Sequence, residues 1–160
     1  MNRGAIFSND RNYRYVLWRV WDDALPKVAW IGLNPSTADE TKDDPTIRRC
    51  VGFARDWRYG GIYMLNLFAF RATSPKVMKA AVDPVGLEND WYIRDYAGFR
   101  SKRVIAAWGT HGDHRNRAQH FAGKCELALA CLGLTKGGCP KHPLYLPAAT
   151  RLIVYSEPKP

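Results

Sequence analysis

The stretch Lys27–Glu40, KVAWIGLNPSTADE, decides the fold of this chain. Val28 to Leu33 form an apolar run without polar alternation, which predicts a strand that is buried on both faces. The strand must end near Pro35, because proline lacks the N–H that a central strand needs. A strand buried on both faces needs cover above and below it, so this run indicates an α/β sheet.

A polar loop and a helix start follow this strand. Asp44 is a suitable N-cap residue, and Pro45 suits the first helical position. An apolar stripe at helical spacing follows, formed by Ile47, Cys50, Val51, Ala54 and Trp57. Ligands of open α/β sheets bind just outside the carboxyl ends of the strands, which makes residues 34–37 a candidate binding loop. The alternative is that NPST is only a well-made turn, since turns use the same residue types.

The rest of the chain repeats the order of strand, loop and helix. Further buried strands are expected over residues 62–68, 104–108 and 131–134. Helices are expected over residues 75–81, 87–99 and 115–130. This order predicts a single α/β domain with a mostly parallel sheet.

The ends of the chain are expected to lie outside this parallel core. Residues 13–22 alternate polar and bulky side chains, which predicts a half-buried strand antiparallel to residues 28–33. It is expected at the edge of the sheet, where its arginines would block further pairing. Residues 1–12 are expected to be loose, and residues 147–160 to form a C-terminal tail or an edge strand.

Composition indicates the partners and the compartment. At 160 residues the chain is long enough for one domain with a proper core. A formal net charge of +9 and a pI near 9.6 favour an anionic partner, with nucleic acid or a nucleotide first and a membrane surface second. Neither a bilayer-spanning run nor a signal peptide is seen, so we expect a cytoplasmic protein without a membrane partner.

The four cysteines are Cys50, Cys125, Cys131 and Cys139, and none of them forms a C-x-x-C pair. Their spacing fits no common zinc pattern, although four cysteines can also ligate an iron–sulfur cluster. Cys50 and Cys125 fall in apolar helical patterns and are expected to be small core residues. Free thiols agree with a reducing compartment, and we expect neither a metal nor another cofactor.

Each predicted parallel strand ends in a loop with a polar candidate residue. These residues are Asn34, Asn66, His111 and His142. Because the carboxyl ends of parallel strands meet at one edge of a sheet, the four loops together are a stronger signal than any single motif. His111 and His114 have a spacing that metal ligands use, but this loop offers no third ligand, which favours an ordinary flexible loop.

Basic side chains near the polar loop are candidates for phosphate binding. Arg48 and Arg49 lie one turn from the helix N-terminus, where guanidinium groups can meet phosphate oxygens. The alternative is a solvated helix face or a pair with Asp43 or Asp44.

Two other segments carry candidates for contacts with nucleic acid. Lys136 and Lys141 lie in a basic loop that is rich in glycine and proline, and they are a second pair of candidate phosphate ligands. Phe68 and Phe70 follow Asn66 and can stack on a base. The alternative for both phenylalanines is an ordinary place in the core.

Five short motifs taken together resemble a small uncharacterised family, the domain of unknown function 1643. The motifs are NPSTAD, DPTIRRC, NLFA, AWG and HPLYL, at residues 34–39, 44–50, 66–69, 107–109 and 142–146. The resemblance extends from about Tyr13 to Leu146, and by itself it implies no chemistry.

A second, more distant resemblance does imply a reaction. Residues 31–35, IGLNP, are similar to the first motif of the uracil-DNA glycosylase superfamily, above all its mismatch-specific branch. His142-Pro143 is similar to the second motif of that superfamily, and Asn66 resembles its base-reading asparagine. The resemblance implies a three-layer α/β/α sandwich with a mostly parallel four-stranded sheet. Two departures are Leu144 in place of a serine, and Asn34 where the strongest uracil branch has an aspartate.

The resemblance implies a DNA glycosylase that hydrolyses the N-glycosidic bond of a damaged or modified base. Cleavage leaves an oxocarbenium-like sugar and a charged base, so the site must position a water and donate to the leaving base. Asn34 is the candidate for the water, and His142 is the candidate donor to the base. Asp39 or Asp44 is the reserve candidate for a general base.

The same resemblance implies a pocket for an unstacked base. Pro35 and Ser36 of the first motif would contact the base, and Asn66 would read its edge. We expect a monomer that binds nucleic acid, with DNA favoured over RNA. Two alternatives stay open: a nucleic-acid or nucleotide-binding module without a reaction, and an N-glycoside hydrolase or transferase that acts on free nucleotides.

Overall fold

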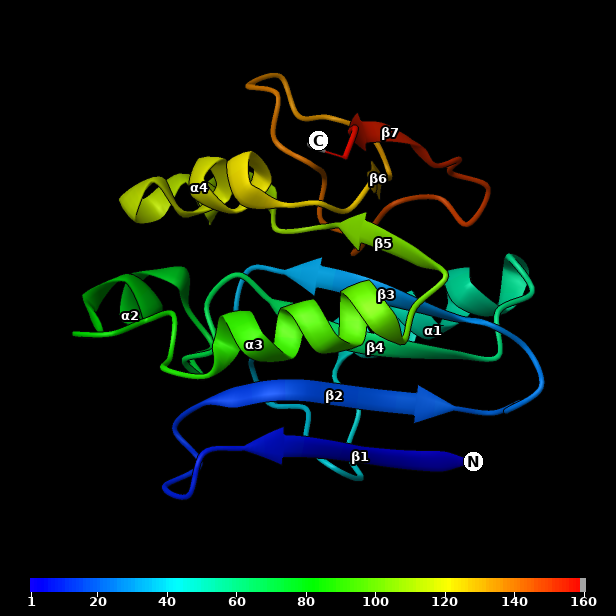
Figure 1. The fold of residues 1–160 in the computed structure, drawn as a ribbon, viewed down its shortest axis with the longest axis horizontal. Helices are drawn as coiled ribbons and strands as arrows, with labels where there is room; N and C mark the ends of the chain where they lie inside the picture. Colours follow the sequence, from blue (N-terminus) through cyan, green and yellow to red (C-terminus); the bar gives the residue numbers. More distant parts are fainter. Residues whose placement is uncertain (159–160) are drawn as a thin grey trace.

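A computed structural model describes residues 1–158 and contains one mixed sheet of seven strands (Figure 1). The strand order across the sheet is β1-β2-β4-β3-β5-β6-β7. The inner strands are all parallel: β4 (Gly61–Asn66), β3 (Lys27–Gly32), β5 (Arg103–Ala106) and β6 (Leu129–Cys131). The predicted α/β class with a parallel core is therefore confirmed, within a larger sheet than expected.

Antiparallel strands flank this core on both sides. β1 (Asn2–Phe7) pairs with β2 (Arg14–Val20), and β2 pairs with β4. The prediction of a loose N-terminus is wrong for β1, because each residue of this segment has a register partner on β2. At the other edge β7 (Ile153–Ser156) pairs with β6, so the C-terminal segment takes the edge-strand form of the two forms expected.

The predicted place of β2 beside β3 is also wrong. Both edges of β3 are occupied by parallel strands, β4 and β5, so β2 can pair only beyond β4. β1 then covers the outer edge of β2. The arginines that were expected to protect an exposed edge are buried instead, since Arg14 is 2% exposed and Arg19 is 1% exposed.

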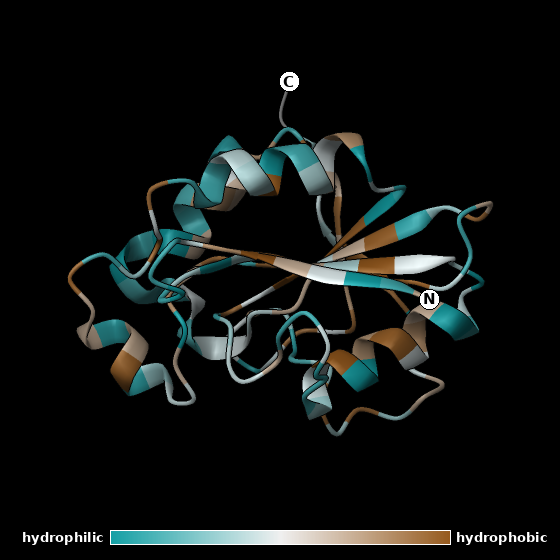
Figure 2. Ribbon diagram, turned by 90° about the horizontal axis from the view of Figure 1, so that it is seen from below, coloured by the Kyte–Doolittle hydropathy of each residue, from teal (hydrophilic) through white to brown (hydrophobic). Residues whose placement is uncertain are grey.

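Helices cover both faces of the sheet, which lies between them in Figure 2. On one face lies α1 (Pro45–Asp56); on the other lie α2 (Pro75–Ala80), α3 (Asn89–Ile93) with its π-helical continuation η1 (Arg94–Phe99), and α4 (Arg117–Lys124). A 3-10 helix, η2 (Gly109–Asn116), precedes α4. Every helix within residues 1–158 is too short or too polar to cross a membrane.

The predicted helix starts are confirmed at α1 and α2. The Asp44 side chain accepts the Ile47 N–H at 2.9 Å, and Ser74 caps α2 in the same way. The predicted helix over residues 115–130 is wrong in its length. It ends at Lys124 because Cys125 takes an extended backbone, and β6 begins two residues earlier than expected.

Two cores explain the apolar run of β3. Val28 and Trp30 pack with the apolar face of α1, in a cluster that contains Phe53. Ala29 and Ile31 face the opposite way and join the cluster of α3 and η1. Because successive strand residues point to opposite faces, burial on both faces removes the polar alternation from the sequence.

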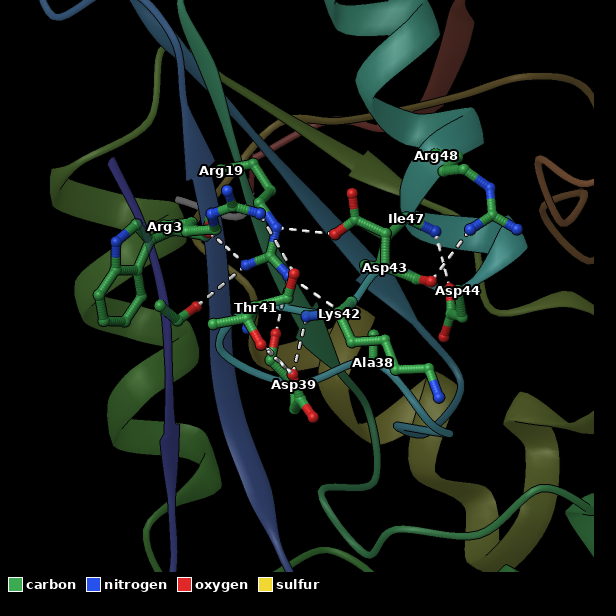
Figure 3. Close-up of polar contacts among 12 residues, drawn as sticks. Arg3, Arg19, Ala38, Asp39, Thr41, Lys42, Asp43, Asp44, Ile47 and Arg48 are labelled. Atoms are coloured by element: carbon green, nitrogen blue, oxygen red, sulfur yellow. Dashed lines mark hydrogen bonds and ion pairs between the residues drawn. The ribbon is translucent and has the colours of Figure 1, made fainter. Parts of the chain in front are cut away.

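A buried guanidinium group holds the loop that leads from β3 into α1 (Figure 3). Arg19 Nε donates to Asp43 Oδ1 at 2.8 Å, and its Nη2 donates to the Asp39 carbonyl at 2.7 Å. Asp39 Oδ1 in turn accepts the backbone N–H groups of Thr41 and Lys42, at 2.9 and 2.8 Å. The loop is therefore fixed to β2 from several points rather than free to move.

Replacing Arg19 with methionine keeps apolar bulk in the core but removes these hydrogen bonds. We expect Arg19→Met to lower the free energy of unfolding by about 2–4 kcal/mol, measured by urea denaturation, because several buried or part-buried carbonyls and the Asp43 carboxylate lose their donor. Arg11→Met is the matched control, since Arg11 forms an exposed ion pair with Glu40 and should change stability little. Equal effects of the two substitutions would contradict the role given to Arg19.

Candidate functional site

A cavity of about 550 Å³ lies at the carboxyl ends of the parallel strands. Its polar lining comes from loops after all four of them and includes Asn34, Ser36, Asp44, Asn66, Thr110, His111, Lys141 and His142. β3 is the point at which the strand order reverses, since β4 lies beside one of its edges and β5 beside the other. Open α/β sheets bind their ligands at such a point.

The predicted meeting of four polar loops is confirmed. Asn34, Asn66, His111 and His142 all line this one cavity, although they are far apart in the sequence. Ser36, Asp44 and Lys141 join them. The other predicted site residues stand outside the lining: Pro35, Asp39, Arg48, Arg49, Phe68, Phe70 and Lys136.

Asn34 is held in one orientation by backbone carbonyls. Its Nδ2 donates to the carbonyl of Pro35 at 3.0 Å and to that of Ala72 at 2.9 Å. Carbonyl oxygens only accept hydrogen bonds, so the amide nitrogen must face them. The oxygen Oδ1 is then the atom of the side chain that remains for a ligand, and it can accept a hydrogen bond from a water molecule.

Asn66 ends β4 and carries an unsatisfied donor. The residue is 1% exposed and lines the cavity, and its Nδ2 has no hydrogen-bond partner within residues 1–158. Gly32 faces it across the strand pair, where an added Cβ would lie 2.8 Å from Asn66 Oδ1. Burying an unpaired amide donor costs free energy, and a ligand that presents an acceptor would recover it.

His142 and Asp44 bring a proton donor and a carboxylate to the cavity. His142 Nδ1 accepts the Leu144 N–H at 3.2 Å, so the neutral ring carries its proton on Nε2. Partial burial lowers the pKa of His142, while the carboxylate of Asp44 raises it. The ring is therefore neutral at pH 7 and offers an N–H to a ligand.

The remaining charged candidates serve the structure around the cavity. Asp39 closes the turn described above, and backbone hydrogen bonds lower its pKa. Arg48 donates to the Asp43 carbonyl at 3.0 Å on an exposed face. Arg49 donates to the Leu146 carbonyl, so it links α1 to the loop that carries His142.

The aromatic candidates also lie elsewhere. Phe68 is buried in the core, with its ring 5.8 Å from that of His114. Phe70 makes an edge contact with Tyr13. The exposed aromatic side chain near the cavity is Tyr145, which is 94% exposed and has a left-handed φ of 68°. It lies between His142 and Leu146, which both line the cavity, and sequence reasoning missed it.

Arg14 is a second residue that sequence reasoning missed. Its side chain lines the cavity, and its Nη1 donates to the Ala38 carbonyl at 2.9 Å. Burial lowers the pKa of Arg14 to about 10, and the charge of Asp44 works in the opposite direction. Nothing in the sequence distinguishes this arginine from a surface arginine of an edge strand.

Within residues 1–158 no three potential metal ligands cluster. Cys50 and Cys125 are buried, as expected, and the cysteines are free thiols. His111 Nδ1 lies 2.9 Å from Lys79 Nζ, so this ring nitrogen is paired with a lysine.

Comparison with family models gives a match to "Protein of unknown function (DUF1643)" over residues 14–144. The chain belongs to this family. No curated protein and no solved structure matched it. In this DUF1643 protein the matched residues include Arg14, Asn34, Asp44, Asn66 and His142, so the family region carries the cavity's main polar groups.

Gly32 keeps the wall of the cavity in place. We expect Gly32→Ala to lower the free energy of unfolding by about 1–3 kcal/mol, because its Cβ would displace Met64 Cε and Asn66 Oδ1. The Asn66 side-chain amide resonances should shift with it in NMR spectra. Gly52→Ala is the control: an added Cβ meets nothing within 4 Å there, and we expect a gain of about 0.5–1 kcal/mol. An unshifted Asn66 amide in Gly32→Ala would contradict this contact.

The charge of Asp44 supports the basicity of His142. Asparagine also caps helices well, so Asp44→Asn should keep α1 folded while removing the charge. We expect the pKa of His142 to fall further in this variant, measured by NMR titration of the ring protons. Asp95→Asn, on the opposite face of the sheet, should leave the midpoint of the His142 titration unchanged. A raised or unchanged His142 pKa in Asp44→Asn would be inconsistent with the described geometry.

Proposed function

We propose that this DUF1643 protein binds an unstacked base of a nucleic acid in the cavity and hydrolyses its N-glycosidic bond. The observation that carries the proposal is the buried, unpaired amide donor of Asn66 in the cavity wall. A nucleobase carbonyl is an acceptor of the right kind for it. Asn34 and His142 supply the two other functions that such a reaction needs.

The role of each residue in the proposed reaction follows from the atoms that it presents to the cavity. Asn34 Oδ1 accepts a hydrogen bond from the attacking water and thereby orients it, since an amide is too weak a base to deprotonate it. His142 Nε2–H donates to the oxygen on which charge develops as the base leaves. Asp44, whose charge already acts on His142 and Arg14, stabilises the cationic sugar electrostatically.

Charge and motif order support nucleic acid, with DNA favoured, as the partner. The net charge of +9 favours a polyanion, and Lys141 brings a cation to the cavity. Tyr145 offers an exposed ring on which a base can stack. The two segments that are similar to uracil-DNA glycosylase motifs both contribute to the cavity, through Asn34 and His142.

A hydrolase of free nucleotides is the second candidate. The volume of about 550 Å³ is ample for a complete small ligand, whereas a flipped base alone needs less room. Salt separates the two candidates, because a protein that neutralises several phosphates of a duplex loses affinity steeply as salt rises. The affinity of an enzyme for a free nucleotide changes far less with salt.

The test is cleavage of single- and double-stranded oligonucleotides that carry uracil, thymine mismatches, hypoxanthine or bulky modified pyrimidines. Alkali then breaks the strand at each abasic site. We expect cleavage by wild type and a rate about 10²–10⁴-fold lower for His142→Ala, because the donor to the leaving base is lost. His120→Ala, an exposed change on α4, is the matched control and should cleave like wild type.

Each other outcome points to a different function. Absence of cleavage with salt-sensitive binding would replace the glycosylase by a binding module. Absence of both cleavage and binding would favour an enzyme that acts on free nucleotides. Equal rates for wild type and His142→Ala would show that His142 takes no part in the reaction.

A further inference from the structure

The buried arginines of this protein differ in their partners. Arg14, Arg19 and Arg117 are 2%, 1% and 6% exposed. Arg19 pairs with Asp43, and Arg117 pairs with Asp90. Within residues 1–158, Arg14 has no acidic side chain at ion-pair distance. A buried charge is costly unless an opposite charge compensates it, so Arg14 is the exception that needs an explanation.

The contacts of Arg14 leave part of its guanidinium group unused. One hydrogen bond goes from Nη1 to the Ala38 carbonyl, while Nε has no partner within residues 1–158. The Asp44 carboxylate attracts Arg14 electrostatically without touching it. Its Oδ1 already caps α1 by accepting the Ile47 N–H. With a pKa of about 10, Arg14 stays charged at neutral pH.

The surroundings of Arg14 suit an anion. The residue lines the cavity together with the hydroxyl side chains of Ser36 and Thr46. Thr46 belongs to the first turn of α1, a helix of 12 residues whose N-terminal end carries partial positive charge. Guanidinium and hydroxyl donors beside a helix N-terminus are the groups that bind phosphate and carboxylate oxygens.

We propose that Arg14 anchors an oxyanion subsite in the cavity, which takes a phosphate or a carboxylate group of the ligand. The subsite depends on the cavity and its charges, and it does not depend on glycosidic cleavage. Together with the proposed function it defines the substrate class as nucleotides whose base or sugar carries an acidic group near the reacting bond.

Pairs of ligands that differ by one acidic group separate the two sources of the oxyanion. Calorimetric titration would compare uracil with uracil-5-carboxylate, and 2′-deoxyuridine with its 5′-monophosphate. Inorganic phosphate alone is the fifth probe. We expect the acidic member of one pair to bind about tenfold tighter, the gain typical of one charge-assisted hydrogen bond. The pair that shows the gain identifies the base or the sugar phosphate as its source.

Substitutions at Arg14 assign the gain to this side chain. Arg14→Gln should abolish the preference for the acidic ligand, and Arg14→Lys should keep part of it, because lysine keeps the charge without the forked donors. Arg151→Gln removes the same charge from an exposed position outside the cavity lining and should keep the full preference. Circular dichroism would verify that each variant is folded, since Arg14 also contacts Ala38.

A measurement on wild type covers the case in which Arg14→Gln does not fold. The Nε–H resonance of Arg14, assigned by its loss in Arg14→Lys, should shift on addition of the acidic ligand and not of its neutral partner. The proposal is overturned if this resonance stays in place, if Arg14→Gln keeps the preference, or if no acidic probe binds below about 10 mM. Preference for the acidic ligand without cleavage of any oligonucleotide would support the oxyanion subsite and contradict the proposed glycosylase activity.

Discussion

Burial of β3 on both faces and along both edges is the constraint on which the rest of the structure depends. Parallel strands occupy both of its edges, and helices cover both of its faces. Every inner strand then runs in one direction, and all the loops after them open at one edge of the sheet. The cavity follows from this arrangement, because the four loops that meet there are rich in polar side chains.

The polar groups near the cavity divide into those that hold the structure and those left for a ligand. Arg19, Asp39 and Arg49 stand outside the lining and form hydrogen bonds to backbone groups of the surrounding loops. Among the residues that line the cavity, Asn66 and Arg14 have a buried side-chain atom without a partner within residues 1–158, namely Asn66 Nδ2 and Arg14 Nε. Both of the unused groups are donors, so the matching ligand must present acceptors, as nucleobases and phosphates do.

Local sequence signals allowed much of the fold and of the candidate site to be predicted. An N-cap aspartate before a proline is a short-range pattern, and it located the start of α1. The order of strands and helices was enough to bring four polar loops together. Pairing of β1 with β2 was missed because strand partners are chosen by distant segments. The burial of Arg14 was missed, and Phe68 was left between the core and a stacking surface, for a related reason: burial of a single residue depends on neighbours that no local pattern specifies.

The hydrogen bond from Arg49 to the Leu146 carbonyl joins two elements that are nearly a hundred residues apart. One of them, α1, begins beside Asp44, and the other carries His142, so this bond limits how far the two walls can separate. A bond between the walls lowers the conformational entropy that a ligand has to remove when it enters. Discrimination between similar ligands then depends on shape, because a wall tied to α1 yields less readily to a misfitting group.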